Sequence, residues 1–468
     1  MFSKVTTETL QDWETCLRYG IAKIDPNRIQ WLFKLFLDYQ ENNINTEYFE
    51  SSEAGAFNQC SFLKLFRILF YYQWKTRELF DQIFLKLKKL NNHPYHMVRK
   101  EIAMILVPLL GLDVKYGQVC RDIFPGFPKI KQYLDEVLPI LIDGSNSTEL
   151  TFDIAKQMEL ITTSDEKNNN ILEDEADRKK SKETYHKTLE TVALWIREFI
   201  NRTCIFITFP KEVYKMLPFL CQFVDNEEIY KSCLDTLSFW SISITPYNDI
   251  SYVLDIIWQI MVTSNSRKAK LNCLNFLQNF LSTNFMVLCF DENLVSQIET
   301  QILNFMADPR LQVRQKASKI CCGLIHLGFF DQIAVQNKLL KYFHTKISHN
   351  LAQKVTQVVQ FKRQTSIKFK GQDSILDCVE LATYHSGILG LCSIVEAHPY
   401  DIPKYLPGLL MELAKHLHDP QPIPKTIKDT FQEFKRTHQD SWQEHKMKFT
   451  DDELVVLNDL LISPNYYA

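Results

Sequence analysis

Hydrophobic residues recur along most of the chain with the three-to-four-residue spacing of amphipathic α-helices. Strand-like alternation bounded by turn signals is hard to find, and glycine is scarce, at 12 residues. Short polar turns separate the apolar stretches. The pattern predicts an all-α protein, with amphipathic helices at 189–201, 253–262, 269–281 and 294–306 among others.

Two stretches share a proline, three further residues, a Val-Arg pair and then small or aliphatic residues at helical spacing. They begin at Pro94 and at Pro309. In the second stretch, Asp308 stands at the expected N-cap and Pro309 suits the first helical turn. The expected buried face of that helix consists of Val313, Ala317, Ile320 and Leu324.

This spacing is what the inner helix of a HEAT repeat looks like, and a weaker copy starts at Asp419 and runs through Ile427 and Phe431. Because the period is irregular, the fold class that we expect is an all-α, HEAT/ARM-like α-solenoid of degenerate helical hairpins. A compact helical bundle is the alternative, which the length disfavours. The pattern opens at residue 1 without a capping repeat, so we expect the chain to be the end of a longer protein.

Two polar segments interrupt the helical pattern. Residues 162–183 carry runs of charge and asparagine, with too little apolar surface to pack, and predict a charged, solvated loop. Residues 348–374 carry dispersed lysines; such a basic loop serves nuclear targeting, nucleic-acid contact or no more than a surface insertion, and the diffuse charge favours the insertion. The expected organisation is therefore helical repeats at 1–161, 184–347 and 375–462, the two loops between them, and a tail at 463–468.

Composition narrows the classes of function. The formal net charge of −3 gives no reason to expect nucleic acid or an anionic membrane as a partner. The longest apolar run, at 102–112, contains Pro108 and is shorter than the roughly 20 residues that cross a bilayer, and the first residues lack a signal-peptide core. The 12 cysteines follow no spacing rule, so we expect buried thiols in a reducing compartment. These features predict a soluble intracellular protein.

Familiar catalytic motifs are absent from the sequence. It contains no glycine-rich phosphate loop, no Gly-x-Ser-x-Gly elbow and no His-Glu-x-x-His zinc helix. We therefore expect no cofactor and no metal, and a non-catalytic binding scaffold. An enzyme with an unrecognised helical site is an alternative, and it would show a deep pocket that holds clustered ionisable groups.

The last residues form a short aromatic tail. Pro464 ends the preceding apolar helical pattern and holds the residue before it extended. The six residues after Ile462 span at most roughly 20 Å. A hydrophobic residue, a tyrosine and one last residue suit insertion into a partner's pocket, and a frayed terminus is the alternative. The candidate binding residues are Tyr466, Tyr467 and Ala468.

Several short motifs occur together and in order in the C-terminal quarter. They include Ser386-Gly387-Ile388-Leu389-Gly390-Leu391, His398-Pro399-Tyr400-Asp401, His418-Asp419-Pro420, Trp442-Gln443-Glu444-His445 and the tail itself. Together they closely resemble the carboxyl end of the large HEAT-repeat proteasome activators, the proteasome activator complex subunit four family. Upstream, the resemblance rests on helical character and on Tyr247-Asn248-Asp249, and we take it to cover most of the chain.

The resemblance implies a non-catalytic activator that caps an end ring of the proteasome core particle and loosens its gate without ubiquitin or ATP hydrolysis. Tyr466, Tyr467 and Ala468 would enter a crevice between ring subunits, where the terminal carboxylate needs a cationic partner. Acetylated histones are the implied substrates, and the nucleus and cytoplasm the implied setting. A HEAT-repeat transport or scaffold adaptor that binds protein partners on its concave face is the alternative.

The same family is described as carrying a bromodomain-like segment, which corresponds to about residues 268–362. The family's Asn-Phe pair aligns with Gly328 and Phe329, so the amide that would bind the acetyl group is missing. The resemblance makes Phe329 a candidate for lining an acetyl-lysine pocket. The alternative is that Phe329 and Phe330 are core residues at a helix end, with Gly328 as the residue that terminates the helix.

Overall fold

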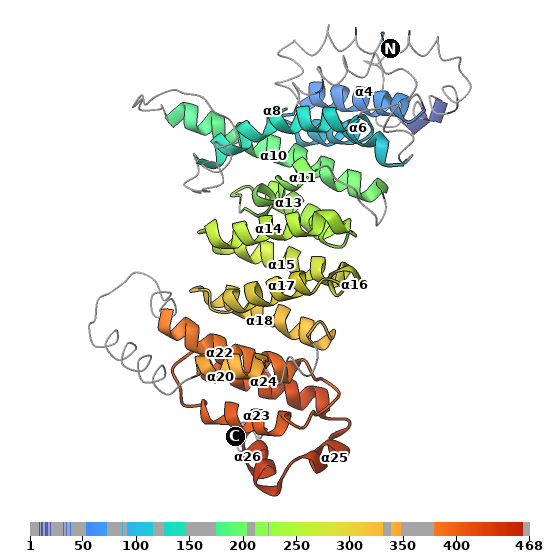
Figure 1. Ribbon diagram of the computed structural model, residues 1–468. Coiled ribbons are helices and arrows are strands. Elements are labelled where there is room, and N and C mark those ends of the chain that lie inside the picture. Colours follow the sequence, from blue (N-terminus) through green and yellow to red (C-terminus); the bar gives the residue numbers. More distant parts are fainter. Residues whose placement is uncertain are drawn as a thin grey trace. The chain divides into compact units, whose positions relative to one another are not determined.

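The computed structural model describes residues 53–72, 91–115, 126–146, 175–203, 211–222, 224–330, 338–347 and 379–461, together with isolated positions before residue 88. Every element in these ranges is a helix (Figure 1). The chain divides into two compact units, Met1–Thr283 (unit 1) and Asn284–Ala468 (unit 2). The all-α prediction is therefore confirmed for the described residues.

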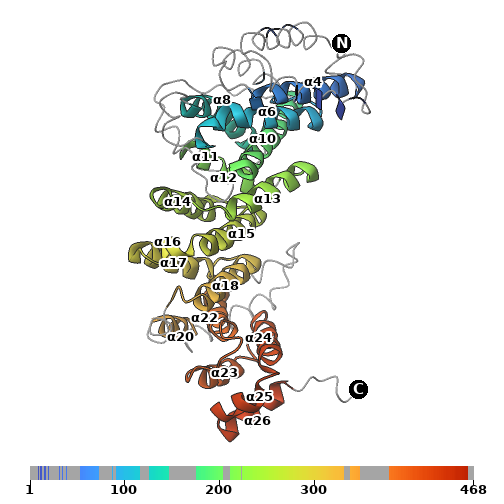
Figure 2. The ribbon, with the colours of Figure 1, turned by 90° about the vertical axis from the view of Figure 1, so that its right-hand side faces the viewer.

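Unit 1 is built from helices that pack mainly on their neighbours in the sequence, as in a HEAT-like solenoid. Figures 1 and 2 both show α10, α13, α14 and α15 following one another in chain order. The helices of unit 1 are α4 (Glu53–Tyr72), α6 (His96–Lys115), α8 (Gly126–Asn146), α10 (Glu175–Thr203), α11 (Lys211–Tyr214), α12 (Leu217–Cys221), α13 (Glu227–Ser241), α14 (Tyr247–Thr263) and α15 (Arg267–Thr283).

The core of unit 1 lies between the apolar faces of these helices. Trp195 of α10 is fully buried, and Thr236 of α13 donates its hydroxyl to the carbonyl oxygen of Ala193 at 3.0 Å. Asn272 of α15 donates to the carbonyl oxygen of Cys221 at 2.9 Å and thereby satisfies the end of α12. The stretches predicted at 189–201, 253–262 and 269–281 lie within α10, α14 and α15, as the periodicity indicated.

Unit 2 is arranged around one central helix, α22, which contacts α18, α20, α23 and α24. Nearly every residue from 381 to 395 is buried, which is typical of a helix that is covered on all sides. The elements of unit 2 are α16 (Phe285–Leu288), α17 (Glu292–Phe305), α18 (Leu311–His326), α20 (Leu340–Lys346), α22 (Val379–Glu396), α23 (Leu406–Lys415), α24 (Ile423–His438), α25 (Trp442–His445), the 3-10 turn η4 (Lys446–Lys448) and α26 (Asp451–Leu461).

Two glycines allow α22 to approach α20 closely. A Cβ added to Gly387 would lie 2.6 Å from Cγ1 of Ile347 and 2.9 Å from the carbonyl oxygen of Phe343. A Cβ added to Gly390 would overlap the ring of Phe343. The two glycines therefore lie at the positions of α22 that come closest to α20, where a larger residue would not fit.

The repeated Val-Arg pattern forms equivalent helices, α6 in unit 1 and α18 in unit 2. In α18 the predicted face is buried, with Val313 and Ala317 fully covered. The prediction that Asp308 caps this helix was wrong: α18 begins at Leu311, with Arg310 at the N-cap. Asp308 instead accepts the backbone N–H of Arg310 at 2.9 Å, because its side chain forms a tight turn just before the helix.

The two polar segments fall largely outside the described residues. Residues 162–174 and all of 348–374 are outside them, whereas 175–183 form the first turns of α10. These residues are rich in Lys and Glu, which favour helix, and Lys187 binds Glu183 at 2.5 Å one turn away.

Most described cysteines are buried, with Cys16 and Cys289 exposed. No helix in the described part of the chain is long and apolar enough to span a membrane.

Candidate functional site

The last described element, α26, ends at Leu461 and precedes the aromatic tail in the sequence. Its first turn is held by a capping box, in which Glu453 accepts the backbone N–H of Thr450 at 2.8 Å and the Thr450 hydroxyl accepts that of Glu453 at 3.4 Å. Leu457 is fully buried where α26 packs on α23 and α24. Val455 and Val456 are left partly exposed on the other side.

The three tail residues predicted to bind a partner lie outside the described residues. Description of α26 ends at Leu461, so Tyr466, Tyr467 and Ala468 have no placement. Their role stays a prediction. What unit 2 contributes is a folded, capped helix that ends shortly before the tail begins.

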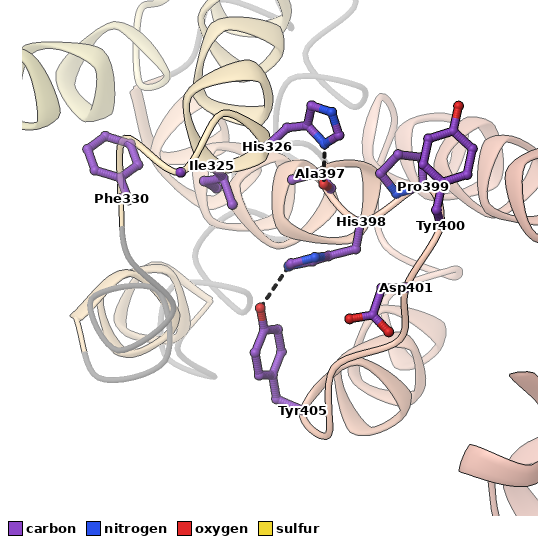
Figure 3. Close-up of a pocket in the computed structure, with 10 residues that line it drawn as sticks. Ile325, His326, Phe330, Ala397, His398, Pro399, Tyr400, Asp401 and Tyr405 are labelled. Carbon is purple, nitrogen blue, oxygen red and sulfur yellow. Dashed lines mark hydrogen bonds between the residues drawn. The ribbon is translucent and has the colours of Figure 1, made fainter. Parts of the chain in front are cut away.

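A pocket of about 310 Å³ lies within unit 2, between the end of α18 and the connection from α22 to α23. In Figure 3 the rings of His398 and Tyr405 and the carboxylate of Asp401 border the same space, whereas the ring of Tyr400 is turned away. Tyr400 is 80% exposed, in agreement with that orientation. The pocket is lined by Ile325, His326, Gly328, Phe330, Ala397, His398, Pro399, Tyr400, Asp401 and Tyr405.

Hydrogen bonds fix the walls of this pocket. His326 donates Nδ1–H to the carbonyl oxygen of Ala397 at 3.0 Å, which joins α18 to the end of α22. His398 Nε2 and the Tyr405 hydroxyl share a hydrogen bond of 2.8 Å across the pocket (Figure 3). Burial lowers the pKa of His398, so its imidazole is neutral near pH 7.

Asp401 is the carboxylate among the residues that line the pocket. Its Oδ1 accepts from Lys448 Nζ at 3.0 Å and from the backbone N–H of Ile402 at 2.7 Å. The bond from Lys448, together with that of Ile402, holds the pKa of this carboxyl below its usual value. The negative charge of Asp401 also raises the pKa of His398 and of Tyr405. For His398 this opposes the effect of burial, whereas for Tyr405 it adds to it. The pocket therefore combines the neutral rings of His398 and Tyr405 with one ionised carboxylate.

Phe329, the predicted acetyl-lysine residue, lies beside this pocket without lining it. The end of α18 forms a Schellman motif: Gly328 N–H bonds the Ile325 carbonyl at 3.0 Å, and Phe329 N–H bonds that of Leu324 at 2.9 Å. Gly328 has a φ of 75°, which glycine adopts without strain. The Phe329 side chain is buried against Phe330, with ring centroids 5.4 Å apart. This geometry matches the core-packing alternative.

The sequence did not point to the pocket residues as a group. Its strongest signal was His398-Pro399-Tyr400-Asp401, a run of polar and aromatic residues between two apolar helices, which entered only as part of the family resemblance. His326 and Phe330 are some seventy residues away in sequence, and only folding brings them to the same place. Among the residues that the structure describes, no group of three or more His, Cys, Asp and Glu side chains is placed to hold a metal ion.

Stacked helical hairpins and a repeated Val-Arg helix define a HEAT-like scaffold. Comparison with known proteins identifies which scaffold it resembles. Residues 381–468 match the family model described as "Proteasome activator complex subunit 4-like, C-terminal". The whole chain aligns at 29% identity with proteasome activator complex subunit 4 of Xenopus laevis, and at 29% with that of Homo sapiens. Residues 381–468 thus match the C-terminal model of this family, and the chain as a whole is similar to these relatives.

A distant relative extends the comparison beyond animals. The proteasome activator BLM10 of Saccharomyces cerevisiae is 23% identical over 98% of this chain. The chain spans 24% of the Xenopus relative, 23% of the human one and 20% of the yeast one. It thus corresponds to about a quarter or less of each relative's length. These relatives are named as proteasome activators, which agrees with the prediction of a non-catalytic protein.

Proposed function

We propose that this chain is a non-catalytic activator of the proteasome core particle. In this proposal it contacts an end ring, inserts Tyr466-Tyr467-Ala468 between two ring subunits and promotes opening of the gate without ubiquitin or ATP hydrolysis. The observation that carries the proposal is the match of residues 381–468, tail included, to a family model for the C-terminal region of such activators. The alignment of the entire chain with the same relatives supports it.

The chemistry of the tail suits this role. The carboxylate of Ala468, once removed from water, requires a cation such as a lysine of the receiving crevice. Tyr467 brings a rigid ring and a hydroxyl that needs one hydrogen-bond partner, and Tyr466 adds apolar area. Insertion opens the gate only if the tail makes contacts in the open state that the closed state lacks.

The test measures hydrolysis of a fluorogenic peptide by purified core particle with and without the 468-residue chain, and follows the complex on a native gel. Wild type is expected to stimulate hydrolysis, and Tyr467→Ala or removal of Ala468 is expected to abolish the stimulation. Tyr19→Ala is the matched control, because it deletes an exposed tyrosine far from the tail in sequence. Equal stimulation by wild type and the tail variants would contradict the role of the tail.

The adaptor alternative makes a different prediction for the same samples. A scaffold that binds partners on its concave face would keep its complexes when the last three residues are removed. Retention of core-particle binding on the native gel by the chain lacking Tyr466-Tyr467-Ala468, without stimulation by wild type, would favour the adaptor.

Acetylated histones as substrates form a separate proposal, which depends on position 328. Asparagine is the side chain besides glycine that most readily adopts a positive φ, and an added Cβ at Gly328 meets no atom within 4 Å. Gly328→Asn is therefore expected to fold and to gain binding to acetylated histone peptides through one amide hydrogen bond. Gly323→Asn, also in open space but outside the pocket, is the control. No gain at Gly328→Asn would favour core packing as the role of Phe329.

A further inference from the structure

The pocket in unit 2 presents hydrogen-bond acceptors and a negative charge. Of the two oxygens of Asp401, Oδ1 carries the bonds from Lys448 and Ile402, and Oδ2 has no partner in the described part of the chain. The Tyr405 oxygen keeps a lone pair whichever way its bond to His398 is directed. An amine with several N–H groups complements such a set, and an anion does not.

The size and the apolar walls of the pocket restrict the ligand further. A volume of about 310 Å³ is at the lower limit of small-molecule sites, roughly 300–1,000 Å³, and holds one long side chain. Ile325 and Phe330 offer apolar surface for a methylene chain, and the ring of Tyr405 offers a π-face to a cation.

We propose that this pocket binds the ammonium group of a lysine side chain from a protein partner, with Asp401 as its counter-ion and Tyr405 as its aromatic wall. The inference is independent of the tail and of gate opening, because it uses only contacts within unit 2. It assigns the pocket to the charged form of lysine, whereas the family-implied ligand is the neutral, acetylated form. An acetyl-lysine would place an uncharged amide opposite Asp401, and Gly328 has no side-chain donor for the acetyl carbonyl oxygen.

Lys448, a residue of this chain, already places an ammonium group against Asp401. Its Nζ lies 3.0 Å from Oδ1 of Asp401 and 3.1 Å from the carbonyl oxygen of Ile402. The side chains of Lys448 and Asp401 are 46% and 66% exposed, so this ion pair is weak and open to exchange. Lys448 therefore competes with an external lysine for Asp401. The external lysine either binds Oδ2 of Asp401 or displaces Lys448 from Oδ1.

The experiment uses the full chain and three end-blocked peptides, Gly-Ser-X-Ser-Gly, in which X is lysine, acetyl-lysine or norleucine. Binding is measured by isothermal titration calorimetry at low ionic strength, where screening is weakest. The lysine peptide is expected to bind on the order of tenfold more tightly than the acetyl-lysine peptide, and the norleucine peptide is expected not to bind.

Two substitutions are expected to act in opposite directions. Asp401→Asn is expected to weaken binding of the lysine peptide on the order of tenfold, since it removes a charge-assisted hydrogen bond. Lys448→Met is expected to strengthen it several-fold by removing the competitor. A gain of affinity is a readout that damage to the fold would not produce. Asp429→Asn is the control for the charge change, because Asp429 is exposed on α24 and does not line the pocket.

The proposal is overturned if acetyl-lysine binds as tightly as lysine to the wild-type chain, or if neither peptide binds. It is also overturned if Asp401→Asn and Asp429→Asn have equal effects on the lysine peptide, because the attraction would then come from general surface charge.

Discussion

Individual buried arginines organise the two Val-Arg helices. Arg314 is fully buried and donates from one guanidinium nitrogen to the carbonyl oxygens of Asp308 and Pro309, at 2.8 and 2.6 Å. Arg99 makes the same two bonds to the residues six and five positions before it. Each arginine thus satisfies the carbonyls of the turn that enters its helix, which the helix itself leaves unpaired.

Replacing Arg314 tests this role. Arg314→Leu is expected to destabilise the chain by about 2–4 kcal/mol, because two buried carbonyls lose a charge-assisted partner. The measurement is chemical denaturation followed by circular dichroism. Gln315→Leu, on the exposed side of the same helix, is the control and is expected to change stability by about 0.5 kcal/mol or less. Equal losses for the two variants would show that the arginine is dispensable.

The third partner of the buried arginine differs between the two helices. Arg99 binds the carboxylate of Glu190, whereas Arg314 donates Nε–H to Nδ1 of His385 at 3.4 Å. His385 in turn donates Nε2–H to the Thr426 hydroxyl at 2.9 Å. Burial, reinforced by the positive charge of Arg314, lowers the pKa of His385 to about 3. Unit 2 therefore contains a histidine that the fold keeps neutral.

This histidine makes stability depend on pH in one direction. The folded chain keeps His385 neutral, but the unfolded chain takes up a proton below about pH 6.5, so acid stabilises the unfolded state. His385 is expected to contribute a loss of about 1.4 kcal/mol per pH unit below pH 6.5, continuing towards its folded pKa, and nothing above pH 7.

The measurement is the free energy of unfolding at pH 7 and pH 5 for wild type and His385→Gln. The variant is expected to be less stable at pH 7 but to lose less stability between the two pH values, because a neutral amide takes up no proton. His418→Gln, at an exposed position, is the control for removing a histidine. An unchanged pH slope in His385→Gln would show that His385 is not the group that titrates.

At the scale of the helices, close crossing depends on glycine at specific positions. Gly390 of α22 faces the ring of Phe343 of α20, with no room for a methyl group. Gly408 of α23 has no atom within 4 Å of an added Cβ. The same substitution at the two positions therefore separates helix propensity from packing.

Gly390→Ala is expected to destabilise the chain by about 1–3 kcal/mol through overpacking, although alanine favours helix. Gly408→Ala is expected to stabilise it by up to about 1 kcal/mol. Thermal melting of both variants provides the measurement. Adding Phe343→Leu to Gly390→Ala is expected to restore part of the loss, and a stabilising Gly390→Ala would contradict the observed crossing.

At the scale of the whole molecule, the chain consists of two compact units in which helices contact mainly their sequence neighbours. The stability of such an array is approximately a sum of contributions from each repeat and its neighbours, so a destabilising substitution affects mainly the helices around it. Gly390→Ala is expected to speed hydrogen exchange in α20, α22 and α24 while leaving α13 to α15 of unit 1 unchanged. Mass spectrometry of peptide fragments measures this, and uniform acceleration across both units would show a single cooperative structure.

Sequence pattern predicted the helices well, because burying one face of a helix imposes a periodicity that is written locally. The buried row of Val313, Ala317, Ile320 and Leu324 is an example. The start of α18 was misplaced, since Asp308 and Pro309 are used in the turn that Arg314 closes from within the helix. Residues 175–183 form the start of α10 although their charge predicts a loop, because lysine and glutamate also have high helix propensity.

The amino-acid sequence by itself determined the all-helical class, the HEAT-like repeat and the resemblance carried by the C-terminal motifs, because each is encoded in residues close together in the chain. Only the tertiary structure decided where His326, His398, Asp401 and Tyr405 meet, and that His385 rather than a carboxylate accompanies Arg314. The contacts of His326 with Ala397 and of Arg314 with His385 join residues 71 positions apart, and their geometry depends on how helices cross, which local periodicity does not specify.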